Sequence, residues 1–292
     1  MIKTKIAGVG YYVPEQIITN QDLEQKMDTS NEWIVSRSGI EERRWVRDGI
    51  CTSDLAFEAS KKAMKAAKVS SEDIDLVIVG TITSDYFFPG VSAQLQDRLD
   101  LHHIGAFDVK AACSAFIYAL SIGDQFIRTG VCSTILIVGA EVQSKFLNIS
   151  TEGRDMTVLF GDGSGAAILQ KSDDESGVLS THLHCQGSNI KNLWMEAPGS
   201  AENCQMTNIK LEEGRHFPLM NGREVFRNAI VRFPEVIQES LDASGLTLDD
   251  VNLIIPHQAN LRISQAVAKR LGVGMDKVFS NIHKYGNTTA AS

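Results

Sequence analysis

The sequence predicts an α/β fold with buried sheets, and three observations support this prediction. Apolar segments of strand length alternate with amphipathic stretches of helical length, as in layered proteins whose sheets are covered on both faces. Hydrophobic residues make up 43% of the 292 residues and charged residues 22%, which is the balance of an ordinary folded protein. A weak internal repeat also relates SEDIDLVI at 71–78 to LDDVNLII at 248–255.

The periodicity of apolar residues predicts individual elements. One helix begins near Ser53-Asp54, with an apolar face formed by Leu55, Ala59, Ala63 and Ala66. A second helix covers Arg223–Ser244 and stops at Gly245. The expected strands are Lys5–Val9, Ile74–Gly80, Ile104–Val109, Thr134–Val138, Val158–Phe160 and Leu253–Ile255.

The internal repeat predicts two halves, residues 1–171 and 172–292. Each copy continues through a strand, a loop and a helix that ends in Arg-Leu. Cys113 follows Gly80 at nearly the same spacing as Asn287 follows His257. Because α/β folds bind ligands where strand ends meet, we expect corresponding strand ends of the two halves to share one cleft.

Charge and targeting features disfavour several classes of protein. The net charge of −8 disfavours a nucleic-acid surface, because phosphate binding needs a basic face. The N-terminal run MIKTKIAGVGYYVP lacks the apolar core of a signal peptide, and no stretch reaches the roughly 18 apolar residues that cross a bilayer. The five cysteines include no CxxC pair. Reduced thiols and a cytoplasmic location are therefore expected.

Cys113 is the main candidate for a catalytic nucleophile. It follows Ala111-Ala112 at the end of an apolar run and precedes the apolar helical stretch Ser114–Arg128. Unpaired N–H groups at a helix start are expected to lower the pKa of a thiol and to favour the thiolate near neutral pH. A single cysteine is more often a small buried hydrophobe, which suits Cys132 and Cys185. Only Cys113 combines a helix start with small neighbours.

Two further segments place polar residues at expected strand ends. His257 ends the apolar run Ile254-Ile255-Pro256, and Asn287 lies in the small and polar segment 286–292. A lone histidine is more often structural than catalytic, and a Gly-Asn pair can form a simple turn. By spacing alone, these two residues and Cys113 are no more than suggestive of a catalytic site.

Taken together, the motifs resemble the β-ketoacyl-[acyl carrier protein] synthase III family, which initiates dissociated (type II) fatty acid synthesis. The resemblance rests on AACSAF at 111–116, PHQAN at 256–260, GNTTAAS at 286–292, DTSNEWIVSRSGI at 28–40 and FGDGSGA at 160–166. It implies a thiolase fold, in which two duplicated halves form a five-layer helix–sheet–helix–sheet–helix arrangement, usually in a homodimer. The family continues past the position of Ser292 through a helix, a Gly-rich loop and two strands. The C-terminal half is therefore expected to lack its final strands.

The resemblance also implies roles for residues at the reaction centre. Cys113 matches the nucleophile of the family, and His257 and Asn287 match the other two members of its catalytic triad. Phe88 matches an aromatic residue that reaches from one subunit into the acyl pocket of its partner.

Further matches concern substrate binding. Trp33 and Arg37 match the pair that holds the adenine of coenzyme A, Trp33 by stacking. Arg154 matches a further arginine that binds the nucleotide. Arg227 and Arg262 match basic positions that receive the acidic carrier protein.

The implied reaction is a two-stage acyl transfer. Acyl-coenzyme A loads Cys113, and malonyl-[acyl carrier protein] is then decarboxylated and condensed to 3-oxoacyl-[acyl carrier protein]. A thioester carbon accepts a thiolate readily, and N–H donors from His257 and Asn287 would stabilise the enolate. Coenzyme A thioester is a substrate, so no separate cofactor or metal is expected. The alternatives are a secondary-metabolite or chalcone-synthase-like condensing enzyme, and a non-catalytic scaffold that binds coenzyme A or a carrier protein.

Two other patterns resemble unrelated kinds of site. The run GDGSGA at 161–166 looks like a dinucleotide fingerprint, but it leads into an expected strand, AILQ, instead of a helix. His182, His184 and Cys185 have metal-ligand side chains, but their alternation is typical of a strand and no fourth ligand stands nearby. A tight turn and a polar strand face are the favoured interpretations.

Overall fold

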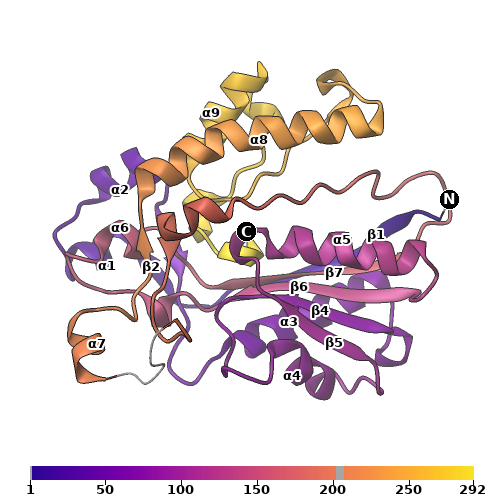
Figure 1. Ribbon diagram of the computed structural model, residues 1–292, viewed down its shortest axis with the longest axis horizontal. Coiled ribbons are helices and arrows are strands. Elements are labelled where there is room, and N and C mark those ends of the chain that lie inside the picture. Colours follow the sequence, from indigo (N-terminus) through magenta and orange to yellow (C-terminus); the bar gives the residue numbers. More distant parts are fainter. Residues whose placement is uncertain (1, 202–206) are drawn as a thin grey trace.

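The computed structural model describes residues 2–201 and 207–292 and alternates strands with helices (Figure 1). The strands are β1 (Thr4–Tyr12), β2 (Ile17–Thr19), β3 (Glu42–Arg44), β4 (Leu76–Gly80), β5 (Gly105–Val109), β6 (Thr134–Glu141), β7 (Gly163–Lys171), β8 (Leu193–Trp194) and β9 (Leu219–Met220). The α-helices are α1 (Asn20–Glu24), α2 (Asn31–Ser38), α3 (Thr52–Ala67), α4 (Val91–Arg98), α5 (Ala115–Arg128), α6 (Arg154–Thr157), α7 (Asn208–Glu212), α8 (Gly222–Ser244), α9 (Leu261–Leu271) and α10 (Ile282–Tyr285). Two of the short 3-10 helices, η2 (Ala112–Ser114) and η7 (Thr289–Ala291), matter for the site.

A five-stranded sheet in the order β1-β7-β6-β4-β5 forms the centre of the N-terminal part. β4 runs parallel to β5 and β6, whereas β7 runs antiparallel to β1 and β6. Every residue of β4 and β6 is buried. Helix α5 covers one face of the sheet, and α3 and α4 cover the other (Figure 1). This double cover explains why both strands are continuous apolar runs without alternation.

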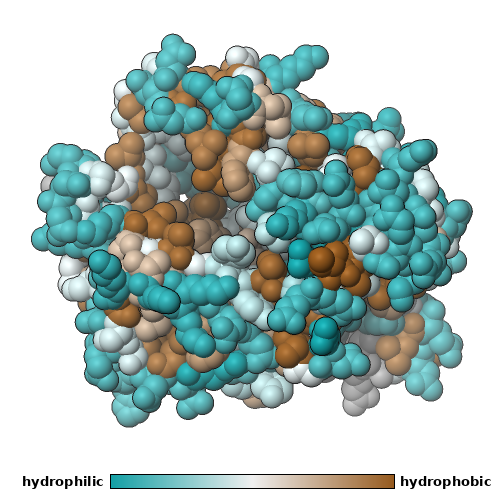
Figure 2. Space-filling view, turned by 180° about the vertical axis from the view of Figure 1, so that it is seen from behind, coloured by the Kyte–Doolittle hydropathy of each residue, from teal (hydrophilic) through white to brown (hydrophobic). Residues whose placement is uncertain are grey.

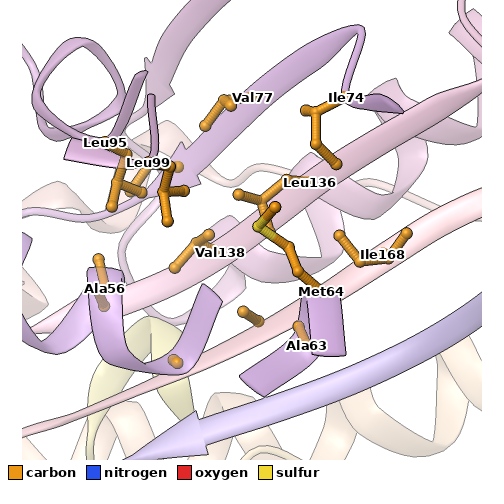
Figure 3. Packing of buried hydrophobic residues seen from close by; sticks show 14 of the residues in the cluster. Ala56, Ala63, Met64, Ile74, Val77, Leu95, Leu99, Leu136, Val138 and Ile168 are labelled. Carbon is orange, nitrogen blue, oxygen red and sulfur yellow. The ribbon is translucent and has the colours of Figure 1, made fainter. Parts of the chain in front are cut away.

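An apolar cluster joins α3 and α4 to the sheet. Ala63 of α3 and Leu95 of α4 pack with Leu136 and Val138 of β6 (Figure 3). α3 also lies very close to β1, since a Cβ added at Gly10 would be 2.3 Å from the carbonyl oxygen of Ala59 in α3. The glycine of β1 therefore permits the contact between strand and helix.

The predicted helix near Ser53-Asp54 is confirmed as α3. Its start is fixed by the Asp54 carboxylate, which accepts a 2.7 Å hydrogen bond from the N–H of Cys51. Leu55, Ala59 and Ala63 are buried as predicted. The prediction is wrong for Ala66, which is exposed, while Met64 is buried.

The C-terminal helices α8 and α9 form the layer farthest from the sheet (Figure 1). α8 confirms the helix predicted at Arg223–Ser244 and ends at Gly245, which has a φ of +66°. Asn260 caps α9 by accepting a hydrogen bond from the N–H of Arg262. In the part of the chain that the structure describes, none of the helices is both long and apolar enough to cross a membrane.

Two predicted strands are not formed. Val158 continues the helical turn after α6, and Phe160 makes only one bridge, to Asn287. Both are buried, so the run 158–160 is apolar because it is buried, and three residues cannot reveal the period of a strand. The run 253–255 likewise makes one bridge, from Ile254 to Val278. Ile255 is 70% exposed, and among the described residues only the segment of Val278 pairs with this run.

Candidate active site

Cys113 lies at the turn between β5 and α5, within η2. The N–H of Ser114 donates to the carbonyl oxygen of Ala111 over 3.1 Å, which closes the turn. Ala112 has a φ of +47°, in the left-handed region that residues with a Cβ rarely adopt. This sharp turn places Cys113 directly before α5, as the sequence predicts.

The surroundings of Cys113 raise the pKa of its thiol to about 12. Burial is the largest cause and the negative charge of Glu141 adds to it, whereas the backbone N–H of Cys113 acts in the opposite direction. The prediction of a lowered pKa is therefore wrong. The N–H groups at the helix start stabilise a thiolate less than its removal from water destabilises it.

Asn287 is held by a short piece of parallel pairing. Its N–H donates to the carbonyl oxygen of Leu159 over 2.8 Å, and its own carbonyl oxygen accepts from the N–H of Gly161 over 3.0 Å. The preceding Gly286 has a φ of +64°, and a Cβ there would lie 2.7 Å from the Leu159 oxygen. Asn287 is only 6% exposed. Glycine at 286 is thus required for the turn that brings Asn287 against this segment.

His257 is positioned by its neighbour Gln258, which is buried. The Gln258 amide donates to the carbonyl oxygen of Pro256 over 2.8 Å and accepts from the N–H of Asn281 over 3.0 Å. Both ring nitrogens of His257 are buried, and neither has a hydrogen-bond partner of acceptable geometry in the described part of the chain. Burial lowers the pKa of His257 to about 4, and the backbone of Ser292 opposes this effect only in part. The imidazole is therefore neutral at neutral pH.

The three residues meet around η7. The turn that holds Cys113, η2, packs against η7. Asn287 precedes η7 by two residues, and Ser292, which directly follows η7, lies beside His257. The structure thus brings Cys113, His257 and Asn287 to one place, although they come from distant parts of the sequence.

Two arginines lie close to the ring of Trp33. The guanidinium carbon of Arg37 is 4.7 Å from the centre of the Trp33 ring system, and that of Arg154 is 5.1 Å from it. Arg154 also forms an ion pair of 3.6 Å with Asp28. The Asn260 amide donates to the carbonyl oxygen of Arg37 over 2.9 Å and links α2 to the start of α9. The predicted nucleotide-binding residues therefore form one cluster.

Phe88 lies in the loop between β4 and α4 and is 80% exposed. Its ring contacts that of Phe87 in an edge-to-face arrangement, and Phe87 is 90% exposed. Large exposed aromatic side chains are typical of interaction surfaces. Figure 2 shows apolar patches on a mainly hydrophilic face, and a hollow with partly apolar borders below the C-terminal helices. Within this chain, Phe88 is a surface residue.

Arg227 and Arg262 are exposed on the adjacent helices α8 and α9. Arg262 lies over the ring of Phe226, with 5.6 Å between the guanidinium carbon and the ring centre. Arg227 forms an ion pair of 3.1 Å with Glu224 in the preceding turn. The pair of arginines therefore lies on a single helical layer, next to the Trp33 cluster.

Sequence reasoning missed three buried polar residues beside the predicted site. Gln258 holds the backbone next to His257, and Gln143 donates to the hydroxyl group of Thr289 in η7 over 2.8 Å. Glu141 ends β6 and is completely buried. The available signal for Glu141 was a charged residue at the end of the apolar run TILIVGA. The signal for Gln258 was its place beside His257.

The two unrelated patterns have structural explanations. The glycine cluster at 161–166 enters β7, a strand, as predicted. The interpretation of the histidine pattern as a strand face is wrong, because residues 178–186 form no strand; His182 and His184 both contact Glu239, at 3.2 and 2.6 Å. Among the residues that the structure describes, no group of three or more His, Cys, Asp or Glu side chains is arranged to hold a metal ion.

Comparison with known proteins reveals relatives along the whole chain. The family model described as 3-oxoacyl-[acyl-carrier-protein (ACP)] synthase III matches residues 107–187, and its C-terminal counterpart matches 241–292. Beta-ketoacyl-[acyl-carrier-protein] synthase III of Xanthomonas campestris pv. campestris is 47% identical, over 100% of this chain and 87% of that relative. The crystal structure of 3-oxoacyl-[acyl-carrier-protein] synthase III from Aquifex aeolicus is 41% identical, with a TM-score of 0.90, over 99% of this chain and 87% of that one. The priming β-ketosynthase of the R1128 polyketide pathway is 30% identical, with a TM-score of 0.89, over 99% and 85%.

Proposed function

This chain belongs to the 3-oxoacyl-[acyl-carrier-protein] synthase III family, and we propose that it condenses an acyl-coenzyme A starter with malonyl-[acyl carrier protein]. The products are carbon dioxide, free coenzyme A and 3-oxoacyl-[acyl carrier protein], the first step of type II fatty acid synthesis. The predicted thiolase fold is confirmed by the similarity to these condensing enzymes. The observation that carries the proposal is the convergence of Cys113, His257 and Asn287 around η7.

In the first half-reaction, the sulfur of Cys113 attacks the thioester carbon of acyl-coenzyme A. The new bond joins Sγ to the acyl carbon, the bond to coenzyme A breaks, and the thiol proton ends on the departing coenzyme A sulfur. A thiol pKa of about 12 means that the resting residue is a thiol at neutral pH. The proton must therefore leave as the new bond forms, and the neutral imidazole of His257 can accept it transiently.

In the second half-reaction, malonyl thioester loses carbon dioxide and its thioester oxygen becomes negatively charged. Hydrogen-bond donors stabilise this enolate, whereas a carboxylate would repel it. His257 is neutral and can donate an N–H. The side-chain oxygen of Asn287 is occupied by an N–H of Thr289, which leaves its Nδ2 group to donate. The enolate carbon then attacks the acyl carbon on Cys113, the bond from that carbon to Sγ breaks, and the released sulfur takes up a proton from solvent to return to a thiol.

Coenzyme A and the carrier protein bind to separate parts of the surface. Trp33, with Arg37 and Arg154 close to its ring, offers an aromatic face and two positive charges to the adenine and phosphates of coenzyme A. Arg227 and Arg262 offer a local positive surface to an acidic carrier protein on a chain of net charge −8.

The exposed rings of Phe87 and Phe88 are consistent with a homodimer in which Phe88 enters the acyl pocket of the partner subunit. A cytoplasmic location remains a prediction from the sequence.

A secondary-metabolite condensing enzyme is the second candidate. The similarity to the R1128 priming ketosynthase supports it, but the identity of 30% is lower than the 47% shared with the synthase of Xanthomonas campestris. A non-catalytic scaffold is less favoured, because all three residues of the site are present and close together.

Intact-mass measurement after incubation with a panel of acyl-coenzyme A thioesters tests the proposal. We expect one acyl adduct per chain, located at Cys113 by peptide mass, and 3-oxoacyl product once malonyl-[acyl carrier protein] is added. A chain that binds coenzyme A but gains no acyl group with any starter would contradict the proposal and favour a scaffold. Product formation with polyketide carrier protein only would favour the second candidate.

A further inference from the structure

Glu141 is a buried acid that the proposed reaction does not use. It is 0% exposed, and no cation pairs with it within the described ranges 2–201 and 207–292. Its carboxylate instead accepts hydrogen bonds from the hydroxyl group of Thr83 over 2.5 Å and from the N–H of Ile82 over 3.1 Å. The Thr81 hydroxyl contributes a longer bond of 3.4 Å. Removing a carboxylate from water costs free energy, which these hydrogen bonds offset only in part.

The hydrogen bonds of Glu141 tie the loop after β4 to the end of β6. The loop after β4 contacts the turn between β5 and α5, which carries Cys113. The N–H of Thr81 donates to the carbonyl oxygen of Val109, the last residue of β5. A Cβ added at Gly80 would be 2.7 Å from the Cβ of Ala115, the first residue of α5. A shift of this loop would therefore displace the turn between β5 and α5.

On its other side, Glu141 reaches η7. β6, which Glu141 ends, packs against η7, and the backbone of Ala290 in η7 lowers the pKa of Glu141. η7 packs against the turn of Cys113 and follows Asn287. The carboxyl group of Glu141 is thus next to both the loop after β4 and η7. The separation of these two segments determines the distance between Cys113 and the enolate donors.

Glu141 also acts on Cys113 through its charge. Burial raises the pKa of Glu141 to about 8, and its hydrogen bonds limit the rise. Among the described residues, the groups that face Glu141 from the β4 loop and from η7 are hydroxyl and backbone groups, and an ionisable group that its charge affects is the Cys113 thiol. The charge that develops on Glu141 as pH rises through its pKa therefore acts on Cys113.

We propose that Glu141 is a positioning residue of the condensing site, which fixes the β4 loop and η7 around Cys113 and opposes ionisation of the thiol through its own negative charge. The positioning role of Glu141 rests on the proposed function. The effect of its charge concerns the Cys113 thiol alone and can be measured without any acyl or malonyl substrate. Failure of this effect can therefore be distinguished from failure of the proposed function.

The charge is tested by the rate of Cys113 alkylation by iodoacetamide as a function of pH, in the parent and in Glu141→Gln. Peptide mass spectrometry assigns the adduct, because the chain has five cysteines. At about pH 6.5, where Glu141 carries a proton, we expect the two rates to agree within about twofold. At about pH 9, Glu141→Gln should react roughly tenfold faster, because loss of a nearby negative charge lowers the thiol pKa by about one unit.

Asp162→Asn is the matched control. Asp162 is also a fully buried carboxylate that accepts backbone and hydroxyl hydrogen bonds, from Val46 and Ser144, but it is not among the groups that shift the pKa of Cys113. Its alkylation profile should match that of the parent. Equal acceleration in Asp162→Asn would mean that loosened packing exposes the thiol, and would overturn the proposal.

Glu141→Asp distinguishes the effect of side-chain length from the effect of charge. It also provides a test of the proposal if Glu141→Gln does not fold. It retains the negative charge but withdraws the carboxylate by one methylene group. We expect an alkylation profile close to that of the parent, unchanged coenzyme A affinity, and condensation reduced by roughly tenfold in kcat with little change in KM. Alkylation in Glu141→Gln that is unchanged at every pH, or full condensation in Glu141→Asp, would contradict the corresponding part of the proposal.

Discussion

The side-chain oxygen of Asn287 accepts a 2.8 Å hydrogen bond from the backbone N–H of Thr289. This bond turns the Nδ2 group of Asn287 away from Thr289 and frees it to donate. Thr289 has a φ of +54°, which is strained for a β-branched residue, and Gln143 holds its hydroxyl group. The strained turn of η7 therefore sets the direction of a donor that the proposed reaction requires.

Asn287→Asp tests this donor with almost no change in shape. One carboxylate oxygen can still accept from Thr289, but the other replaces the Nδ2 donor with a negative charge beside the enolate. Decarboxylation of malonyl thioester should fall by about 10²–10³, the usual cost of one lost oxyanion donor. Acylation of Cys113 by acyl-coenzyme A should continue, and stopped-flow release of coenzyme A measures it. Equal loss in both steps would instead indicate that the turn is damaged.

Trp33→Ala tests the nucleotide site. Coenzyme A binding should weaken by roughly 1–3 kcal/mol, with base-on-aromatic stacking as the model, and isothermal titration calorimetry measures it. Trp194→Ala is the matched control, because Trp194 also has a cation over its ring, Lys191 at 5.4 Å, but lies outside the Trp33 cluster. Unchanged affinity in Trp33→Ala, or the same loss in Trp194→Ala, would remove the assignment.

Charge reversal at Arg227 or Arg262 tests the carrier-protein surface. Either change to Glu should slow the reaction with malonyl-[acyl carrier protein] and reduce its dependence on salt, because local positive charge offsets the repulsion from a chain of net charge −8. Loading from acyl-coenzyme A should be unaffected. Arg232→Glu is the control on the same helix, since Arg232 is exposed and also pairs with a glutamate in the next turn. If all three variants lose rate alike, the effect is a general one of net charge.

The pKa of His257 predicts how stability depends on pH. Folding lowers this pKa from 6.5 to about 4, so between these values the unfolded chain binds a proton that the folded chain does not. The contribution of His257 therefore makes the folded state less stable as pH falls from 6.5 to 4, by about 3 kcal/mol in total. His257→Gln should show a shallower loss of unfolding free energy over this window in urea titrations. His283→Gln, at an exposed position, should keep the slope of the parent.

Much of the sheet and one part of the site were predictable from sequence. β4 and β6 are buried on both faces, so each leaves a continuous apolar run that is easily recognised. The run 158–160 is equally apolar but belongs to a buried turn. Three residues are too few to show the periodicity that distinguishes a strand from such a turn. The position of Cys113 before a helix was predictable because local chain order determines it.

The remaining features depend on tertiary packing. Whether the helix start or desolvation controls the Cys113 thiol depends on how deeply the sulfur is buried, which sequence does not express. The buried charge of Glu141 was visible at the end of an apolar run, but its contacts with Thr83 and η7 come from distant segments. The division into halves at residue 171 and the roles of the individual site residues stay predictions.

Release of labelled carbon dioxide from malonyl-[acyl carrier protein] by Cys113→Ser tests the central claim most directly. A hydroxyl oxygen is a much weaker nucleophile toward a thioester than the sulfur of a thiol, so this variant should gain no acyl group. His257 and Asn287 remain in place, however, so decarboxylation should continue at a measurable rate. The same assay on Asn287→Asp should give the reverse, an acylated Cys113 with little carbon dioxide. If Cys113→Ser releases none while Asn287→Asp decarboxylates at the parent rate, the division of labour between the nucleophile and the enolate donors is wrong.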